Sequence, residues 1–93
     1  MSAAVFNVTQ DVDFTSAANL LYKGEKKIDE CRESLEVHFD SVSATSNSLM
    51  VALMMSWHRH AQLSDKQVSF HHLPRELRKI VEIAGLSDTL PLA

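Results

Sequence analysis

Histidine is the residue type in this sequence that most invites a search for chemistry, because five histidines occur in 93 residues. His58 and His60 are two residues apart in a predicted helix, so their side chains point to opposite sides. His71 and His72 are adjacent and should diverge at the end of a predicted strand. Zinc sites on helices use ligands four residues apart, and neither pair has that spacing. We therefore predict no metal site and no bound cofactor.

A hydrolytic triad could be assembled on paper from Ser48, a histidine and an acid such as Asp40. Nothing in the sequence assigns these roles, because no GxSxG nucleophile elbow is present. Phosphate-binding loops are rich in glycine, and the two glycines of the chain, Gly24 and Gly85, are far apart. We predict that the chain is not an enzyme.

The segment 41–48 is the strongest local feature, because it consists largely of side chains that bond their own backbone and favour turns and caps. It predicts a loop that ends in a helix N-terminus. A phosphate on Ser48 would lie beside free backbone N–H groups and the positive end of the helix dipole, and would add about two negative charges. Simple capping of the helix explains the same composition. The loop and cap candidates are Ser43, Thr45, Ser46 and Asn47.

The helix predicted from Leu49 to Leu63 is apolar around most of its circumference in its first half. Methionine and tryptophan stripes of this kind are more often core than binding surface in so small a domain. The helix is nevertheless more apolar than a one-sided cover of a sheet requires, so part of it should meet a partner. The partner-facing candidates are Leu49, Met50, Met54 and Trp57.

Composition predicts one cytoplasmic domain spanning residues 1–93. The hydrophobic fraction of 45% and the charged fraction of 23% are typical of a globular chain. A net charge of −3 without a basic stripe argues against a nucleic-acid partner. The single cysteine, Cys31, indicates a reducing compartment. The longest apolar run, 49–55, is far shorter than the ~20 residues that span a bilayer, and no N-terminal signal is visible, so we expect no membrane insertion.

Hydrophobic periodicity predicts alternating strands and helices. The strands are expected at 5–9, 35–39 and 67–71, and the helices at 13–30, at 49–63 and from Pro74 to a stop at Gly85. The first helix has an apolar stripe of Phe14, Ala18, Leu21, Tyr22 and Ile28. Right-handed crossovers would lay these strands in one sheet with the helices packed against it. The tail, 87–93, is expected to be short and irregular.

The order and spacing of these segments resemble the STAS domain family, the sulfate-transporter and anti-sigma-antagonist modules, and within it the MlaB-like (YrbB-like) branch. The resemblance rests on residues 35–42, 47–48, 52–57, 68–77 and 83–91, and so covers nearly the whole chain. It implies an α/β fold with a single sheet of about four strands, mixed or largely parallel, covered by three to four helices. The family usually has an extra short strand before the one predicted at 5–9.

The resemblance also implies a site. In the family, the helix after the central strand begins with an Asp and then a Ser or Thr, and that hydroxyl is phosphorylated in the anti-sigma antagonists related to SpoIIAA. Counting back from Trp57 places Ser48 at the hydroxyl position and Asn47 at the Asp position. Asparagine can still cap the helix, but it removes a charge next to the phosphate acceptor.

Both branches of the family imply a partner-binding protein. MlaB-like proteins are cytoplasmic accessory subunits that bind the ATPase of an ABC transporter, which moves phospholipid between the membranes of Gram-negative bacteria. The anti-sigma antagonists instead bind a kinase that also sequesters a sigma factor. The resemblance therefore implies an ABC ATPase as the partner or, as the alternative, an anti-sigma factor kinase that phosphorylates Ser48.

Overall fold

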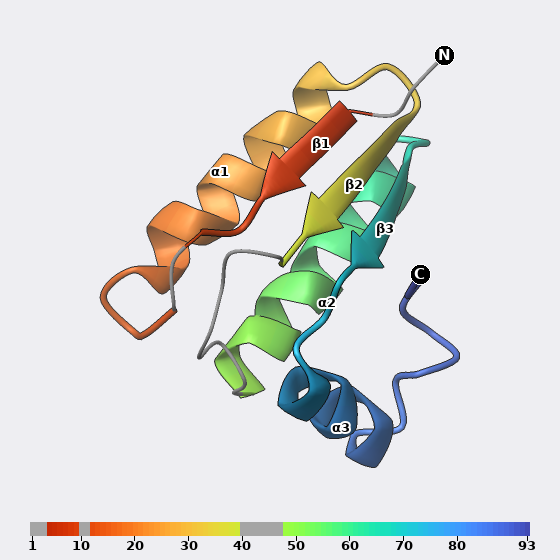
Figure 1. The fold of residues 1–93 in the computed structure, drawn as a ribbon. Coiled ribbons are helices and arrows are strands. Elements are labelled where there is room, and N and C mark those ends of the chain that lie inside the picture. The colour runs from red at the N-terminus through yellow and green to blue at the C-terminus, as the bar shows by residue number, and fades with distance from the viewer. Residues whose placement is uncertain (1–3, 10–11, 40–47) are drawn as a thin grey trace.

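The computed structural model describes residues 4–9, 12–39 and 48–93. Strands and helices alternate along the chain, and the three strands form one parallel sheet in the order β1-β2-β3 (Figure 1). The elements are β1 (Ala4–Asn7), α1 (Ala17–Glu30), β2 (Ser34–His38), α2 (Ser48–Leu63), β3 (Gln67–His71) and α3 (Arg75–Ile83). The predicted α/β class and the predicted order of elements are confirmed.

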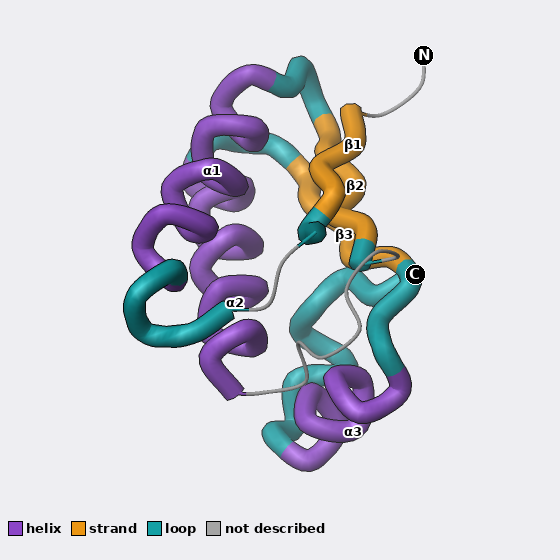
Figure 2. The backbone as a smooth tube through the Cα atoms, turned by 60° about the vertical axis from the view of Figure 1, so that its left-hand side comes forward, coloured by secondary structure: helices purple, strands orange, loops and turns teal. Residues whose placement is uncertain are grey.

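Two helices cover one face of the sheet. Both crossovers step in the same direction along the sheet, and right-handed crossovers then bring α1 and α2 to the same side (Figure 2). Alternate strand residues point toward these helices and are buried, namely Phe6, Leu35, Val37, Val68 and Phe70. The other face carries mostly polar residues, and no described helix lies over it (Figure 2).

The sheet has three strands in the described residues, where the resemblance implied about four. Within the described part of the chain, no strand precedes β1. The predicted irregular tail instead bonds along the edge of β3: the Phe70 N–H donates to the Pro91 carbonyl oxygen (2.9 Å), and the Ala93 N–H donates to the Phe70 carbonyl oxygen (2.9 Å). These bonds occupy the edge where a further strand would pair, but they form only a single bridge, between Phe70 and Leu92.

The first helix begins later than predicted, at Ala17 rather than near Asp13. The Asp13 carboxylate accepts hydrogen bonds from the backbone N–H groups of Thr15 and Ser16, both at 2.9 Å, and from the Thr15 hydroxyl. The bond from the Thr15 hydroxyl and those from Ser16 lower the pKa of Asp13. Asp13 therefore organises the turn that leads into α1, as local side-chain to backbone bonding would predict.

The buried face of α1 differs from the predicted stripe. Ile28 is buried as predicted, and Leu21 is partly buried against the core. Phe14 (92% exposed), Tyr22 (61% exposed) and Ala18 are exposed instead, and Leu20 and Gly24 complete the buried face. Phe14 was placed on the helix by its spacing, but it lies in the turn before the helix begins, so helical periodicity does not apply to it.

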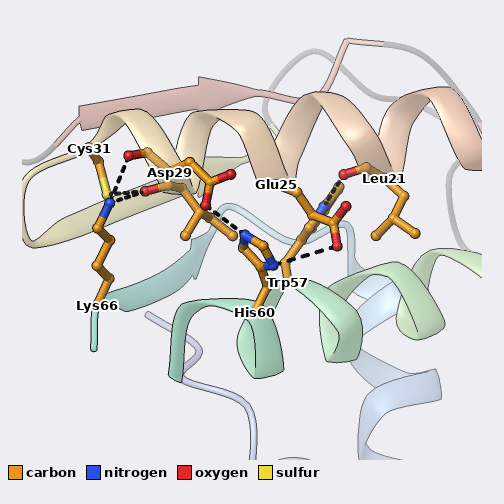
Figure 3. Close-up of polar contacts among 8 residues, drawn as sticks. Leu21, Glu25, Asp29, Cys31, Trp57, His60 and Lys66 are labelled. Carbon is orange, nitrogen blue, oxygen red and sulfur yellow. Dashed lines mark hydrogen bonds and ion pairs between the residues drawn. The ribbon is translucent and has the colours of Figure 1, made fainter. Parts of the chain in front are cut away.

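Trp57 of α2 packs directly against Gly24 of α1. A Cβ atom at Gly24 would overlap the indole ring, so only glycine fits there. The indole Nε1–H donates to the Leu21 carbonyl oxygen at 3.0 Å (Figure 3), and the ring meets Phe6 edge-on with centroids 5.9 Å apart. The glycine that weakens α1 by propensity is therefore the residue that makes room for the Trp57 indole between the two helices.

Polar contacts also join α1 to α2 and to Lys66 in the loop after α2 (Figure 3). His60 Nε2 lies 2.8 Å from Asp29 Oδ1, and its other ring nitrogen, Nδ1, lies 3.7 Å from Glu25 Oε2. The Lys66 ammonium donates to the carbonyl oxygens of Ile28 (2.9 Å) and Asp29 (2.8 Å), so a positive charge satisfies the last carbonyls of α1.

The last helix ends as the sequence predicted. Gly85 has a φ of +73°, in the left-handed region that glycine adopts without strain. The Leu86 N–H donates to the Val81 carbonyl oxygen (3.0 Å) and the Gly85 N–H to the Glu82 carbonyl oxygen (3.0 Å), which is the bonding pattern of a Schellman motif.

Candidate functional site

The N-termini of the three helices lie at the carboxyl edge of the sheet, since each helix follows a parallel strand (Figure 1). Ligands and partners of open α/β sheets are commonly recognised at this edge. Ser48 is the first residue of α2 and is exposed, and Leu49 beside it is half-buried. Backbone N–H groups of the first turn have no partner within the helix, so this end of α2 favours negative charge.

The remaining loop and cap candidates lie outside the described residues. Ser43, Thr45, Ser46 and Asn47 belong to the segment 40–47, which connects β2 to α2. Their predicted roles stay predictions.

Three of the four predicted partner-facing residues of α2 belong to the core of this chain. Met50, Met54 and Trp57 are 0% exposed. The reason is that α2 packs against α1, β3 and α3 and so needs apolar side chains around most of its circumference. The prediction that these three residues face a partner is wrong. Leu49, the fourth, is only partly buried and packs at the margin of the core.

Most of the exposed surface of α2 is a stripe of small and polar side chains, Ser48, Ala52, Ser56 and Arg59, called here the α2 stripe. The last turn of the helix adds the exposed side chains of Gln62 and Leu63. Successive members of the α2 stripe are three or four residues apart, so they lie on one face of the helix. A shallow groove of about 400 Å³ runs beside the stripe, lined by Met55, Ser56, His58, Arg59, Gln62 and Thr89. Sequence analysis missed this surface because it searched for apolar residues, whereas the signal is the small residues between them.

An exposed aromatic ring lies at the same edge of the sheet as Ser48. Phe14 is in the turn between β1 and α1, and this turn follows the carboxyl end of β1. Isolated exposed apolar residues are normal on protein surfaces. Because Phe14 lies at the edge of the sheet where α2 begins, it is a candidate contact for a partner that binds the α2 stripe.

A second group of polar side chains gathers on the open face of the sheet, away from α1 and α2. Glu36 Oε1 lies 2.9 Å from His38 Nε2 and 3.9 Å from His71 Nε2. The hydrogen bond with His38 lowers the pKa of Glu36 below its ordinary value, although partial desolvation opposes the shift. Glu36 is therefore a carboxylate at neutral pH.

The adjacent histidines do not diverge as predicted. The ring of His72 lies 5.2 Å from the ring of His38 and 6.2 Å from that of His71, measured between centroids. Successive residues of a strand point to opposite faces, but His72 has a φ of +60°, which ends the strand geometry and returns its ring toward the others. The sequence-based comparison of histidine spacings considered only neighbours along the chain, so it missed a cluster formed across two strands.

Comparison with known proteins identifies the fold. The family model described as "Mlab, STAS domain" matches residues 1–92. The chain belongs to the MlaB family of STAS domains. STAS domains are protein-interaction modules and are generally non-catalytic. No curated protein matches the chain at the level of sequence.

The fold of this STAS domain is similar to that of a solved structure, the anti-sigma factor antagonist SpoIIAA in its unphosphorylated form. The TM-score is 0.72 at 16% sequence identity, and the likeness covers 96% of this chain and 77% of that one. The predicted membership of the STAS family is thus confirmed. None of the described helices is long and apolar enough to cross a membrane.

Proposed function

We propose that this STAS domain is a non-catalytic accessory subunit that acts in the cytoplasm and binds the ATPase subunit of an ABC transporter for phospholipid. The family match supports the class of partner, since the resemblance to MlaB-like proteins implies an accessory subunit of such a transporter. The observation that carries the proposal is the division of α2 into an apolar part, buried in the core, and an exposed stripe of small residues beside a groove.

The α2 stripe suits contact with a partner helix. Serine and alanine side chains let another backbone approach closely, and the groove beside them can accept larger side chains. A helix of 16 residues is about 24 Å long, so the stripe alone falls short of the ~800 Å² that a standard interface buries on each partner. Phe14 and the first turn of α2, with Ser48, extend the surface along the carboxyl edge of the sheet.

Replacement of Ala52 by arginine tests this surface. Ala52 is exposed at the centre of the α2 stripe, so Ala52→Arg should weaken binding to the purified ATPase subunit of the same host by at least about tenfold, equivalent to about 1.4 kcal/mol. Its melting temperature should stay that of the unsubstituted protein, since no core contact changes. Calorimetric titration against the ATPase subunit measures the first quantity, and thermal unfolding followed by circular dichroism measures the second.

The matched control is Glu30→Arg, which also introduces an arginine at an exposed helical position. Glu30 is the last residue of α1 and lies at the end of the sheet away from the first turn of α2. The control should bind as the unsubstituted protein does. Equal affinity of Ala52→Arg and the unsubstituted protein would remove the α2 stripe from the interface. Failure of the unsubstituted protein to bind any ABC ATPase of its host would end the accessory-subunit proposal itself.

The alternative function is that of an anti-sigma factor antagonist switched by phosphorylation of Ser48. The fold likeness to SpoIIAA and the exposure of Ser48 at a helix start support it. Incubation with the host's anti-sigma kinase and ATP should then add one phosphate, seen in the intact mass. Ser48→Ala should prevent the addition, and Ser56→Ala, two turns further along the α2 stripe, should not. Asn47→Asp should speed the reaction if the missing charge limits kinase recognition. An unchanged mass would count against this alternative.

A further inference from the structure

The open face of the sheet presents a set of metal-ligating side chains in register. In the parallel pairing of β2 with β3, Glu36 lies opposite Ser69 and His38 lies opposite His71. Residues two apart on a strand point to the same face, so all four side chains stand on the face that α1 and α2 leave open. One ligand atom each from Glu36, His38 and His71 lie within 4.8 Å of one another.

The three side chains have the chemistry of a zinc-type site. Two imidazoles and one carboxylate form a common ligand set for Zn²⁺ with an open position, and they also suit other divalent transition metals. With bond lengths of about 2.0–2.1 Å, ligand atoms around tetrahedral zinc lie roughly 3.3 Å apart. The observed separations of 2.9 and 3.9 Å from the Glu36 oxygen to the two imidazole nitrogens bracket that value.

The positions of the ligands are well determined by their surroundings. All three project from hydrogen-bonded strands, and their side chains are only 19% (His38), 34% (Glu36) and 23% (His71) exposed. Ser69 Oγ lies 2.8 Å from His71 Nε2, the nitrogen that also faces Glu36, so an ion bound to this nitrogen takes the place of the Ser69 contact. His72 adds a third imidazole at the margin of the cluster. Ligands fixed in this way lose little side-chain entropy when they bind an ion.

We propose that Glu36, His38 and His71 form a binding site for a divalent transition-metal ion of the zinc class. The ion replaces the contact between Glu36 and His38 and the contact between Ser69 and His71, and it takes one ligand atom from each of its three proposed ligands. Its fourth position faces solvent, where water or a donor from another molecule completes the coordination. The site lies on the opposite face of the sheet from α2 and is independent of the proposed partner surface.

His60 shows what distinguishes this cluster from an ordinary surface histidine with acidic neighbours. It also has two carboxylates nearby, but Asp29 faces Nε2 and Glu25 faces Nδ1. The two ring nitrogens of an imidazole point away from each other, so these three groups share no common point where an ion could sit. His60→Ala is therefore the matched control, because it removes an imidazole near carboxylates without removing a proposed ligand.

Zinc titration of the untagged protein, after treatment with a chelator, tests the proposal. Calorimetry should show one Zn²⁺ bound per chain, and Zn²⁺ should raise the melting temperature. His71→Ala and Glu36→Gln should each weaken binding by at least roughly 100-fold, more than the loss of an outer-shell partner usually costs. His60→Ala and Ala52→Arg should bind Zn²⁺ as the unsubstituted protein does. Circular dichroism checks that all variants are folded.

Substitution of Co²⁺ gives a second readout that does not depend on affinity alone. A tetrahedral site with nitrogen ligands should produce strong visible absorption, and His71→Ala should abolish it. Unchanged Zn²⁺ affinity in both His71→Ala and Glu36→Gln would overturn the proposal, as would loss of binding in His60→Ala equal to that in His71→Ala. Failure of the unsubstituted protein to bind any ABC ATPase of its host would leave the zinc result unaffected, so the two proposals fail separately.

Discussion

Gly24→Ala is expected to lower the free energy of unfolding by about 1–3 kcal/mol, the usual cost of overpacking a filled core. Helix propensity alone would predict a gain in stability, since alanine is favoured over glycine inside a helix by about 1 kcal/mol. The added methyl group would overlap three atoms of the Trp57 indole. The ring cannot easily move away, because the Leu21 carbonyl oxygen accepts its hydrogen bond and Phe6 packs against it in an edge-to-face contact.

Urea unfolding followed by far-UV circular dichroism measures this effect. Lys23→Ala, at the neighbouring exposed position of α1, is the control and should change stability by no more than about 0.5 kcal/mol. In a Trp57→Leu background the indole is absent, so the same Gly24→Ala change should lose its penalty and approach the gain expected from propensity. A higher stability of Gly24→Ala in the unsubstituted background would contradict the close packing of α1 on α2.

Met54→Glu is expected to lower the free energy of unfolding by more than about 3 kcal/mol at neutral pH. This is a large part of the roughly 5–15 kcal/mol by which typical domains are stable. Met54 is 0% exposed, so the new carboxylate would lie in the core without a partner. Ala52→Glu introduces the same group two residues earlier, on the exposed α2 stripe, and should leave stability within about 0.5 kcal/mol. Chemical unfolding of both variants compares the two positions directly.

The pH dependence of the Met54→Glu variant has a definite sign. Burial raises the pKa of the introduced carboxyl in the folded state above its unfolded value of about 4.3. The folded state then binds more protons than the unfolded state, so the destabilisation relative to the unsubstituted protein is smallest near pH 4 and grows as the pH rises toward the folded pKa. Equal effects of Met54→Glu and Ala52→Glu on stability at pH 7 would show that Met54 is not buried, and would restore it as a partner contact.

These two experiments separate folding from binding on a single helix. Met50, Met54 and Trp57 are buried in the core, so substitutions of these residues are expected to reduce partner binding only by unfolding the domain. The α2 stripe can be altered without that consequence. Interface tests on this protein therefore belong at Ala52 and Ser56, and substitutions of Met50 or Met54 would give a loss of binding that says nothing about the interface.

Local patterns were sufficient for much of this protein. The alternation of apolar residues predicted the strands at 35–39 and 67–71 to within one residue, and the helix after Asn47 was predicted to within one residue at its start. Gly85 and Leu86 predicted the end of α3, because a Schellman motif is built from residues adjacent in sequence. The STAS family followed from the order and spacing of such segments, and the family match confirmed it.

The remaining features depend on contacts between residues far apart in the chain. Trp57 meets Gly24 across two helices, so neither the need for glycine nor the burial of Trp57 is visible in either segment alone. The sequence alone does not show whether an apolar side chain packs in the core or against a partner. Met50 and Met54 were predicted to face a partner, but both are buried in the core. His38 and His71 are 33 residues apart in the sequence and lie side by side because the parallel pairing of β2 with β3 puts them in register. Periodicity shows which face of an element is polar, but strand register and helix packing determine which polar faces meet.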